Sequence, residues 1–164
     1  MDALECLRTR QSIRSYKNKP VSKKALETLV DAGRLAATTC NYQQWEFVVI
    51  TNPDMKKKIA DITAHGKFIA DSGACIIVFY KEFDYYLEDG CAATQNILLA
   101  AKALGLGTCW IGGDKSPYCR EVADMLGVPK DYKLISFIAV GHPEEIPPRA
   151  PKRSLKEVIH WEKF

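Results

Sequence analysis

Arginine and serine alternate near the start of the chain, in the segment Arg10-Gln11-Ser12-Ile13-Arg14. If this segment is extended, alternate residues point to one side, so Arg10, Ser12 and Arg14 converge on one spot. The planar donors of arginine match phosphate oxygens two at a time. A second basic pair, Lys152-Arg153, could contact the same phosphate from the other end of the chain. The pattern suits a phosphate site, and it also suits solvated charges at a helix end and in a tail.

A polar segment, Thr38-Thr39-Cys40-Asn41-Tyr42-Gln43-Gln44-Trp45, lies between a predicted helix and a predicted strand. The amides of Asn41 and Gln43 each offer a donor and an acceptor. That chemistry suits the edge of a planar heterocycle, whose N–H and C=O groups alternate. An ordinary helix-to-strand loop with self-capping side chains would have the same composition. Cys40 and Tyr42 are expected to pack rather than to react.

The glycine-rich segment from Gly105 to Gly113 would let a ligand approach the backbone closely. It is not a GxGxxG motif followed by a helix, and the chain has no P-loop, so neither nucleotide motif is supported. The histidines lack ligand spacing and no GxSxG motif is present, which argues against a metal site and a Ser-His-Asp triad. Glu88 and Asp89 are expected on an exposed helix face.

The composition is that of one ordinary globular domain: 164 residues, 47% hydrophobic and 26% charged. The net charge of +3 is too small to argue for nucleic acid or a membrane surface. The six cysteines include no CxxC pair, and several lie in apolar runs. No signal-peptide pattern is present and no apolar run approaches the ~20 residues that cross a bilayer. We therefore expect a reduced, cytoplasmic protein.

Hydrophobic periodicity and capping residues predict an α+β domain with one sheet of about four strands. Ser22 is expected to cap a helix, and Pro53 to stand at the first position of another. The expected helices cover 2–9, 22–37, a segment opening at 52, 84–104, and a segment opening at 116; the expected strands cover 45–50, 74–80, 107–111 and 134–140. The segment 91–104 is apolar almost all round, which predicts burial in a core or in a subunit interface.

The chain ends in a proline-rich stretch, which is expected to be extended. It still carries an apolar segment, Leu155-Lys156-Glu157-Val158-Ile159-His160-Trp161. Because a solvated tail has no need of such residues, we expect this segment to dock on another surface.

In this order the segments resemble the nitroreductase family of FMN-dependent flavoproteins over almost the whole chain, from Leu4 to Trp161. Family members commonly have Arg-Arg-Ser-x-Arg, Pro-Val-Ser, Ala-Pro-Ser-x-x-Asn-x-Gln-Pro-Trp, Gln-Asn followed by Gly-Leu-Gly, Gly-x-Pro and Val-x-x-Trp. The matching residues here are Arg10–Arg14, Pro20–Ser22, Ala37–Trp45, Gln95-Asn96 with Gly105–Gly107, Gly141–Pro143 and Val158–Trp161.

The resemblance implies a single domain over 1–164, with a mainly antiparallel sheet of about four to five strands flanked by helices. It also implies an interlocked homodimer with two flavins at its interface, and a tail, 142–164, that docks on the partner subunit. By the same resemblance, the phosphate and ribityl end of FMN would contact Arg10, Gln11, Ser12 and Arg14, together with Lys152 or Arg153. The flavin ring would lie near Thr39, Asn41 and Gln43, often from the partner subunit, and beside Ile111, Gly112 and Gly113.

The family's activity would make this chain an enzyme that passes hydride from NAD(P)H through FMN to a small acceptor such as a nitroaromatic or a quinone. Other flavin chemistry on the same fold (reductive dehalogenation or flavin breakdown) and a non-catalytic FMN-storing or FMN-sensing protein remain alternatives. No catalytic acid or base stands out in the sequence.

Two departures from the family pattern concern the loop nearest the ring. Thr38-Thr39 replaces Pro-Ser, and Gln44 replaces the proline before Trp45, so this loop is expected to be looser. The chain also lacks a long mid-chain insertion that covers the substrate pocket of larger members, which predicts an open active site.

Overall fold

The structure is a computed structural model that describes residues 2–164. Helices and strands follow one another in the predicted order: α1 (Ala3–Thr9), α2 (Lys23–Arg34), β1 (Trp45–Ile50), α3 (Pro53–Ile62), β2 (Ala74–Lys81), α4 (Tyr86–Ala103), β3 (Gly107–Gly112), α5 (Cys119–Met125) and β4 (Tyr132–Gly141). Short 3-10 helices occupy η1 (Thr39–Asn41), η2 (Lys67–Ile69) and η3 (Leu155–Glu157).

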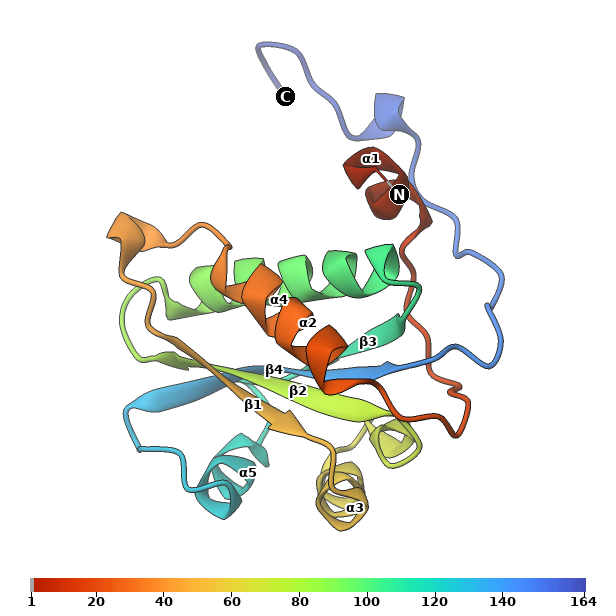
Figure 1. Ribbon diagram of the computed structural model, residues 1–164. Coiled ribbons are helices and arrows are strands. Elements are labelled where there is room, and N and C mark those ends of the chain that lie inside the picture. The colour runs from red at the N-terminus through yellow and green to blue at the C-terminus, as the bar shows by residue number, and fades with distance from the viewer. Residues whose placement is uncertain (1) are drawn as a thin grey trace.

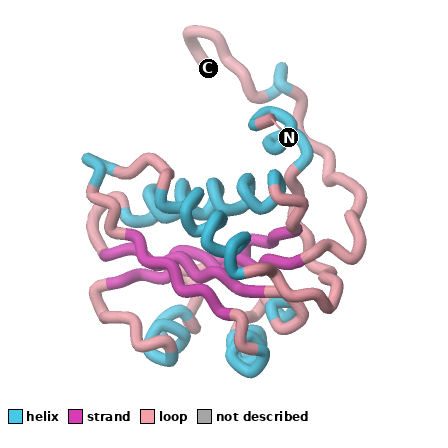
Figure 2. Tube along the Cα trace, viewed as in Figure 1, coloured by secondary structure: helices cyan, strands magenta, loops and turns pink. Residues whose placement is uncertain are grey.

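The four strands form one antiparallel sheet in the order β1-β2-β4-β3. Helices α2 and α4 cover one face of the sheet, and α3 and α5 cover the other (Figures 1 and 2). The central strands β2 and β4 are almost entirely buried, as expected of strands that are covered on both faces. This arrangement confirms the predicted α+β class.

Alternation along β2 divides the interior into two cores. Cys75, Ile77 and Phe79 belong to the core on the side of α3 and α5. Ile76 and Val78 belong to the core on the side of α2 and α4. Both faces of the sheet are therefore sealed, and a ligand has to bind at an edge of the sheet or beyond its ends.

Helices α2 and α4 pack closely because Gly33 has no side chain at their contact. A Cβ on Gly33 would lie 3.0 Å from Ile97 of α4 and 3.1 Å from Phe47 of β1. Along α4, Ile97 and Leu98 are buried while Leu99 remains partly exposed. The outer side of α4 therefore includes apolar residues, such as Leu99, that this chain covers only in part.

The capping predictions are confirmed: the Ser22 hydroxyl accepts a hydrogen bond from the Ala25 amide at 3.2 Å, and Pro53 opens α3. Several boundaries differ from expectation by one to three residues, and the two largest differences are at α2 and α5. Helix α2 ends at Arg34 rather than near residue 37, because Leu35 is exposed and no longer extends the buried stripe. Helix α5 begins at Cys119, since the residues after Ser116 first form a turn in which the Cys119 amide donates to the Ser116 carbonyl.

The C-terminal tail leaves the body of the protein and passes α1 (Figure 1). Every residue from 144 to 164 is exposed, including Trp161 at 78%. Among residues 2–164, no helix is long and apolar enough to cross a membrane.

Candidate functional site

The segment 10–14 runs along the outer edge of β3. Ser12 forms a parallel bridge with Thr108, and the Ile13 amide donates to the Thr108 carbonyl at 2.9 Å. Ile13 is buried, and Gly107 lies against it so closely that a Cβ there would meet Ile13 at 2.9 Å. The segment is thus extended, as predicted, and it is fixed in place by its own apolar residue.

The start of the tail is held against the same part of the chain. The Lys17 amide donates to the His142 carbonyl at 2.9 Å, and the Glu144 amide donates to the Ser15 carbonyl at 3.1 Å. The Gln11 Nε2 then donates to the Pro147 carbonyl at 2.8 Å. These contacts bring residues 147–152 beside residues 10–14, although more than 130 residues separate them in sequence.

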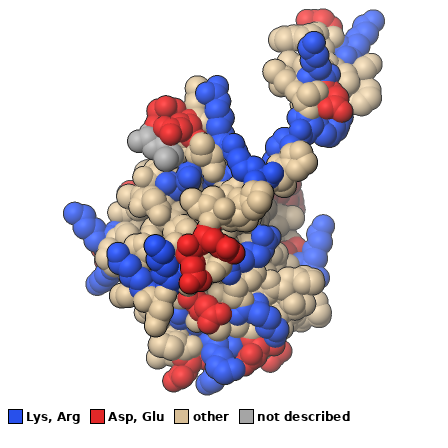
Figure 3. Space-filling view, turned by 90° about the vertical axis from the view of Figure 1, so that its right-hand side faces the viewer, with Lys and Arg blue, Asp and Glu red and all other residues tan. Residues whose placement is uncertain are grey.

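A basic cavity of about 800 Å³ lies between these two segments. Its lining includes five cations, Arg8, Arg10, Arg14, Arg149 and Lys152, and no carboxylate from the part of the chain that the structure describes. Figure 3 shows Lys and Arg side chains gathered where the tail leaves the body. Such a cavity attracts an anion, and its guanidinium groups suit a phosphate.

Two of these cations, Arg8 and Arg149, are additions to the predicted set. Each lies in or beside a basic run that the sequence displays, but only the fold shows that both runs face one cavity. Arg153 is not brought into the cavity, and its guanidinium donates instead to the Glu157 carbonyl at 2.6 Å.

Gln11 leaves one polar atom free at the edge of the cavity. Its Oε1 is buried, and no described residue donates to it. A buried acceptor without a partner costs free energy, so a bound ligand that carries a hydroxyl would relieve this cost.

A second hollow, of about 210 Å³, lies along β3. Arg14 lines both hollows, and the second also includes His65, Trp110, Ile111 and Gly112. A Cβ on Gly112 would meet nothing within 4 Å, so the space beside this glycine is open. The two hollows together suit an elongated ligand with an anionic end.

Gly113, next along the chain, is placed differently. A Cβ there would lie 2.6 Å from the Ile135 carbonyl oxygen, so the missing side chain lets the turn after β3 pack on β4. This glycine is required by the fold.

Cys109 is a thiol whose surroundings include two of the cationic residues, Arg14 and Arg10. Burial raises the pKa of Cys109, while Arg14, the Ser12 hydroxyl and Arg10 oppose that rise. The thiol therefore stays protonated near neutral pH and is not an activated nucleophile.

The polar loop 38–44 lies at the opposite end of α4. It contacts the first turn of α4, whereas the basic segment lies beside Lys102, Gly105 and Leu106 at the other end. Helix α4 has 18 residues, which corresponds to about 27 Å. The loop 38–44 of one chain is therefore separated from the basic segment 10–14 of that chain by the length of α4 (Figure 1).

Asp89 corrects a prediction. Glu88 is exposed as expected, but Asp89 is only 5% exposed. It accepts hydrogen bonds from the Thr39 amide at 3.1 Å and from the Tyr80 hydroxyl at 2.9 Å. Its position in the first turn of α4 points the carboxylate at the loop rather than at solvent, a contact that spans 50 residues and leaves no local signal in the sequence.

Among residues 2–164, no three His, Cys, Asp or Glu side chains are grouped closely enough to hold a metal ion. The arrangement therefore offers three features: a cationic cavity, an open hollow beside β3, and a fixed polar loop at the far end of α4.

The family model described as Nitroreductase family matches this chain over residues 7–74 and 65–142. A protein of Archaeoglobus fulgidus described as an NADH dehydrogenase/NAD(P)H nitroreductase is 31% identical, over 98% of this chain and 99% of its own length. The FMN reductase (NADPH) of Bacillus subtilis is 24% identical, over 97% of this chain and 73% of its own length.

Among solved structures, an FMN-dependent nitroreductase of Clostridium difficile has a TM-score of 0.91 and is 26% identical, covering 98% of this chain and 99% of that one. The likeness therefore extends over almost the whole of both chains.

Proposed function

Because this chain belongs to the nitroreductase family, we propose that it is an FMN-dependent oxidoreductase. In this proposal it takes hydride from NAD(P)H and passes it to a small acceptor such as a nitroaromatic or a quinone. The observation that carries the proposal is the five-cation cavity, which shares Arg14 with an open hollow beside β3.

The residues present fit FMN on two counts. Arg10, Ser12, Arg14 and Lys152 line the cavity and would hold the phosphate, and the unpartnered Gln11 Oε1 would accept from a ribityl hydroxyl. The open space beside Ile111 and Gly112 would admit the ring. Gly113 would contribute its backbone, and Arg153 would act at the margin of the site, through the tail that it helps to shape.

FMN, when bound, would supply the hydride-accepting and hydride-donating chemistry of the reaction. The protein itself would bind FMN, orient it and stabilise its charge. Arg14 lines both hollows, so its positive charge would lie near a cofactor that occupies them. The nearby thiol of Cys109 takes no part, because it remains protonated.

We propose that the working unit is a homodimer in which each site is shared. Thr39, Asn41 and Gln43 lie at the opposite end of α4 from Arg10, so one FMN cannot contact both groups within one chain. A second copy, packed on the apolar outer side of α4, would bring its own loop to the ring. This placement supports the expectation that the loop acts on the partner's cofactor.

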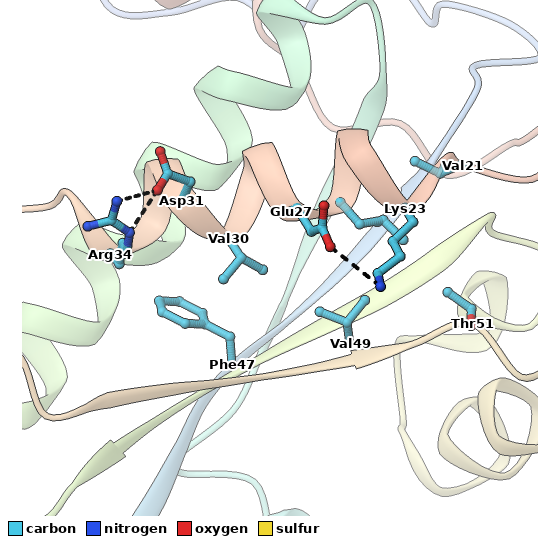
Figure 4. Close-up of a pocket in the computed structure, with 10 residues that line it drawn as sticks. Val21, Lys23, Glu27, Val30, Asp31, Arg34, Phe47, Val49 and Thr51 are labelled. Atoms are coloured by element: carbon cyan, nitrogen blue, oxygen red, sulfur yellow. Dashed lines mark hydrogen bonds and ion pairs between the residues drawn. The ribbon is translucent and has the colours of Figure 1, made fainter.

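The exposed tail supports the same assembly. A groove of about 720 Å³ lies between α2 and the edge strand β1. Val30, Phe47 and Val49 form its apolar floor, and ion pairs Lys23–Glu27 and Asp31–Arg34 lie along it (Figure 4). We propose that Leu155–Trp161 of the second copy fills this groove, since the apolar segment is exposed on its own chain.

All six cysteines are free thiols. We therefore propose that the enzyme works in the reducing environment of the cytoplasm.

The visible spectrum of the purified chain tests the main proposal. With FMN added, the protein should be yellow, and the flavin absorbance should bleach when NADH or NADPH is added without oxygen. A colourless protein that takes up no FMN would overturn the proposal. A yellow protein that does not bleach would instead indicate storage or a different flavin chemistry.

Arg10→Ala tests the cavity itself. Loss of one charge-assisted contact to phosphate should weaken FMN binding by about tenfold or more, as measured by quenching of flavin fluorescence. Arg120→Ala, an exposed arginine on α5, is the matched control and should leave the affinity unchanged. Equal affinity of both variants would remove Arg10 from the site.

A further inference from the structure

We propose that Asp89 is a positioning residue: it holds the loop 38–44 in the conformation that presents Asn41 and Gln43 to the cofactor bound by the partner subunit. This inference rests on the proposed function.

The first support is the completeness of the contacts around the Asp89 carboxylate. Both of its oxygens accept from the Thr39 amide at 3.1 Å, Oδ1 accepts from the Thr39 hydroxyl at 3.2 Å, and Oδ2 accepts from the Tyr80 hydroxyl at 2.9 Å. Two of the three donor groups thus belong to Thr39, so the carboxylate is committed to the loop.

The second support is the setting of the charge. The donors to Asp89 among the described residues are all neutral, so it is not one half of a buried ion pair. A carboxylate in the first turn of a helix is stabilised by the helix dipole. Burial raises the pKa of Tyr80, which keeps the hydroxyl protonated and able to donate. Neutral donors and the start of a helix therefore surround the Asp89 side chain, and no cation among the described residues contacts it.

The third support is the backbone of the loop. Cys40, Asn41 and Gln43 have φ values of 48°, 58° and 53°, in the left-handed region that favours glycine. Asparagine tolerates this region, but cysteine and glutamine do so rarely. Such a conformation persists only where surrounding contacts fix it, and it occurs preferentially at functional sites.

The contacts that fix the loop come from both of its ends. At the start, Asp89 binds Thr39, and at the end, the Gln43 amide donates to the Thr38 hydroxyl at 3.2 Å. Between them, Tyr42 packs edge-on against Phe83 with ring centroids 5.8 Å apart. These contacts do what prolines at positions 38 and 44 would otherwise do, so the absence of those prolines does not by itself loosen the loop.

The loop residues therefore have two different roles: Thr39 supports the loop, and Asn41 and Gln43 are available to a ligand. The Thr39 hydroxyl donates to Asp89, which assigns Thr39 to the support of the loop. Asn41 and Gln43 are exposed, and neither side chain contacts Asp89. The Gln43 side chain makes one long contact inside the loop, from Nε2 to the Asn41 carbonyl at 3.3 Å, so both side chains keep acceptors and donors for a ligand edge.

The test compares Asp89→Asn with Glu88→Gln, which removes the same charge from the exposed neighbouring residue. Asp89→Asn replaces one acceptor by a donor that opposes the Thr39 amide or the Tyr80 hydroxyl. We expect FMN binding to weaken by at least about tenfold and the visible spectrum of the bound flavin to shift. Glu88→Gln should match the unaltered chain in both.

Inorganic phosphate, used as a competitor of FMN, distinguishes a loss of loop positioning from a general disruption of the fold. The phosphate cavity lies at the other end of α4, so the inhibition constant of phosphate should be unchanged in Asp89→Asn. If phosphate affinity falls together with FMN affinity, Asp89 supports the whole fold and the proposal is wrong. If Asp89→Asn binds FMN as Glu88→Gln does, the proposal is also wrong.

A milder pair keeps the test decisive if Asp89→Asn does not fold. Thr39→Val removes one hydroxyl donor to Asp89, and Thr39→Ser retains it. We expect Thr39→Val to weaken FMN binding severalfold and Thr39→Ser to restore it, and equal affinities would overturn the proposal. An unaltered chain that binds no FMN would defeat the proposed function and this inference with it, whereas an effect confined to the variants bears on Asp89 alone.

Discussion

Arg14 is the basic residue that lines both the basic cavity and the hollow along β3. Its neighbour Ile13 is buried and forms the backbone contact to Thr108. One apolar residue thus sets the direction of the polar residues on either side of it, Ser12 and Arg14. The chemistry of the segment depends on this alternation as much as on the arginines.

Cys75 gives a pH dependence that can be measured at the scale of one residue. Burial raises the pKa of Cys75 to about 12, whereas a thiol in the unfolded chain has a pKa near 8.5. Each pKa unit of this difference corresponds to about 1.4 kcal/mol in the free energy of unfolding. Between these values the unfolded chain loses the proton and the folded chain keeps it. The stability that Cys75 contributes is therefore complete below about pH 8.5 and falls as the pH rises above it.

Urea denaturation of the unaltered chain and of Cys75→Ala, under reducing conditions, measures this effect. The difference in free energy of unfolding between the two should shrink by about 1 kcal/mol from pH 9 to pH 10. Cys40→Ala, which removes an exposed thiol, is the control. A difference for Cys75→Ala that stays constant with pH would show that the thiol does not titrate on unfolding.

At the scale of elements, the end of β3 carries two adjacent glycines with different roles. Gly113→Ala would place a Cβ 2.6 Å from the Ile135 carbonyl oxygen, so we expect a loss of about 1–3 kcal/mol of stability. Gly112→Leu would place its side chain in open space, so the melting temperature should change little while FMN affinity falls. Thermal unfolding and flavin titration distinguish the two.

The role of Gly112 in leaving space for the ring would be wrong if Gly112→Leu were strongly destabilised, or if it bound FMN with unchanged affinity. In the first case the hollow beside β3 would be part of the core, and in the second the ring would lie elsewhere. Gly112→Ala provides a control with the smallest addition to the same open space.

The elements differ in how well the sequence predicts them. The strands β2 and β4 are predictable because they are buried on both faces and therefore read as continuous apolar runs. The helices begin where Ser22 and Pro53 indicate, since capping is local. The end of α2 is not predictable, because no glycine or proline follows Arg34 closely and only the fold shows that Leu35 is exposed.

The candidate site follows the same division. Arg10, Ser12 and Arg14 are predictable because alternation within a short extended segment is a local property. The contribution of Arg8 and Arg149 depends on hydrogen bonds between distant segments, such as Gln11 to Pro147. The prediction of an exposed Asp89 is wrong for the same reason: its partners are Thr39 and Tyr80, and no pattern around residue 89 points to either.

At the scale of the whole molecule, the tail carries apolar side chains that its own chain leaves exposed. Trp161 is 78% exposed and Leu155 is 72% exposed. Aromatic residues of this kind often dominate an interface. We expect Trp161→Ala to weaken the dimer by about tenfold or more, as measured by sedimentation over a range of protein concentrations.

Lys163→Ala changes a neighbouring exposed residue and is the matched control, which should sediment as the unaltered chain does. Truncation after Ser154 removes the whole apolar segment but keeps Lys152 in the basic cavity, and should shift the protein to monomer. A truncated chain that remains fully dimeric would show that the outer side of α4 suffices for association.

The length of α4 has a consequence for mixtures of two chains that carry different inactivating substitutions. It places the basic cavity and the polar loop at opposite ends of one helix, so in the homodimer that we propose each site would need the cavity from one copy and the loop from the other. A chain that has lost Arg10 still carries an intact loop, and a chain that has lost Asn41 still carries an intact cavity. When two such chains pair, one of their two sites contains both defects and the other contains neither, so two inactive alleles expressed together would restore part of the activity.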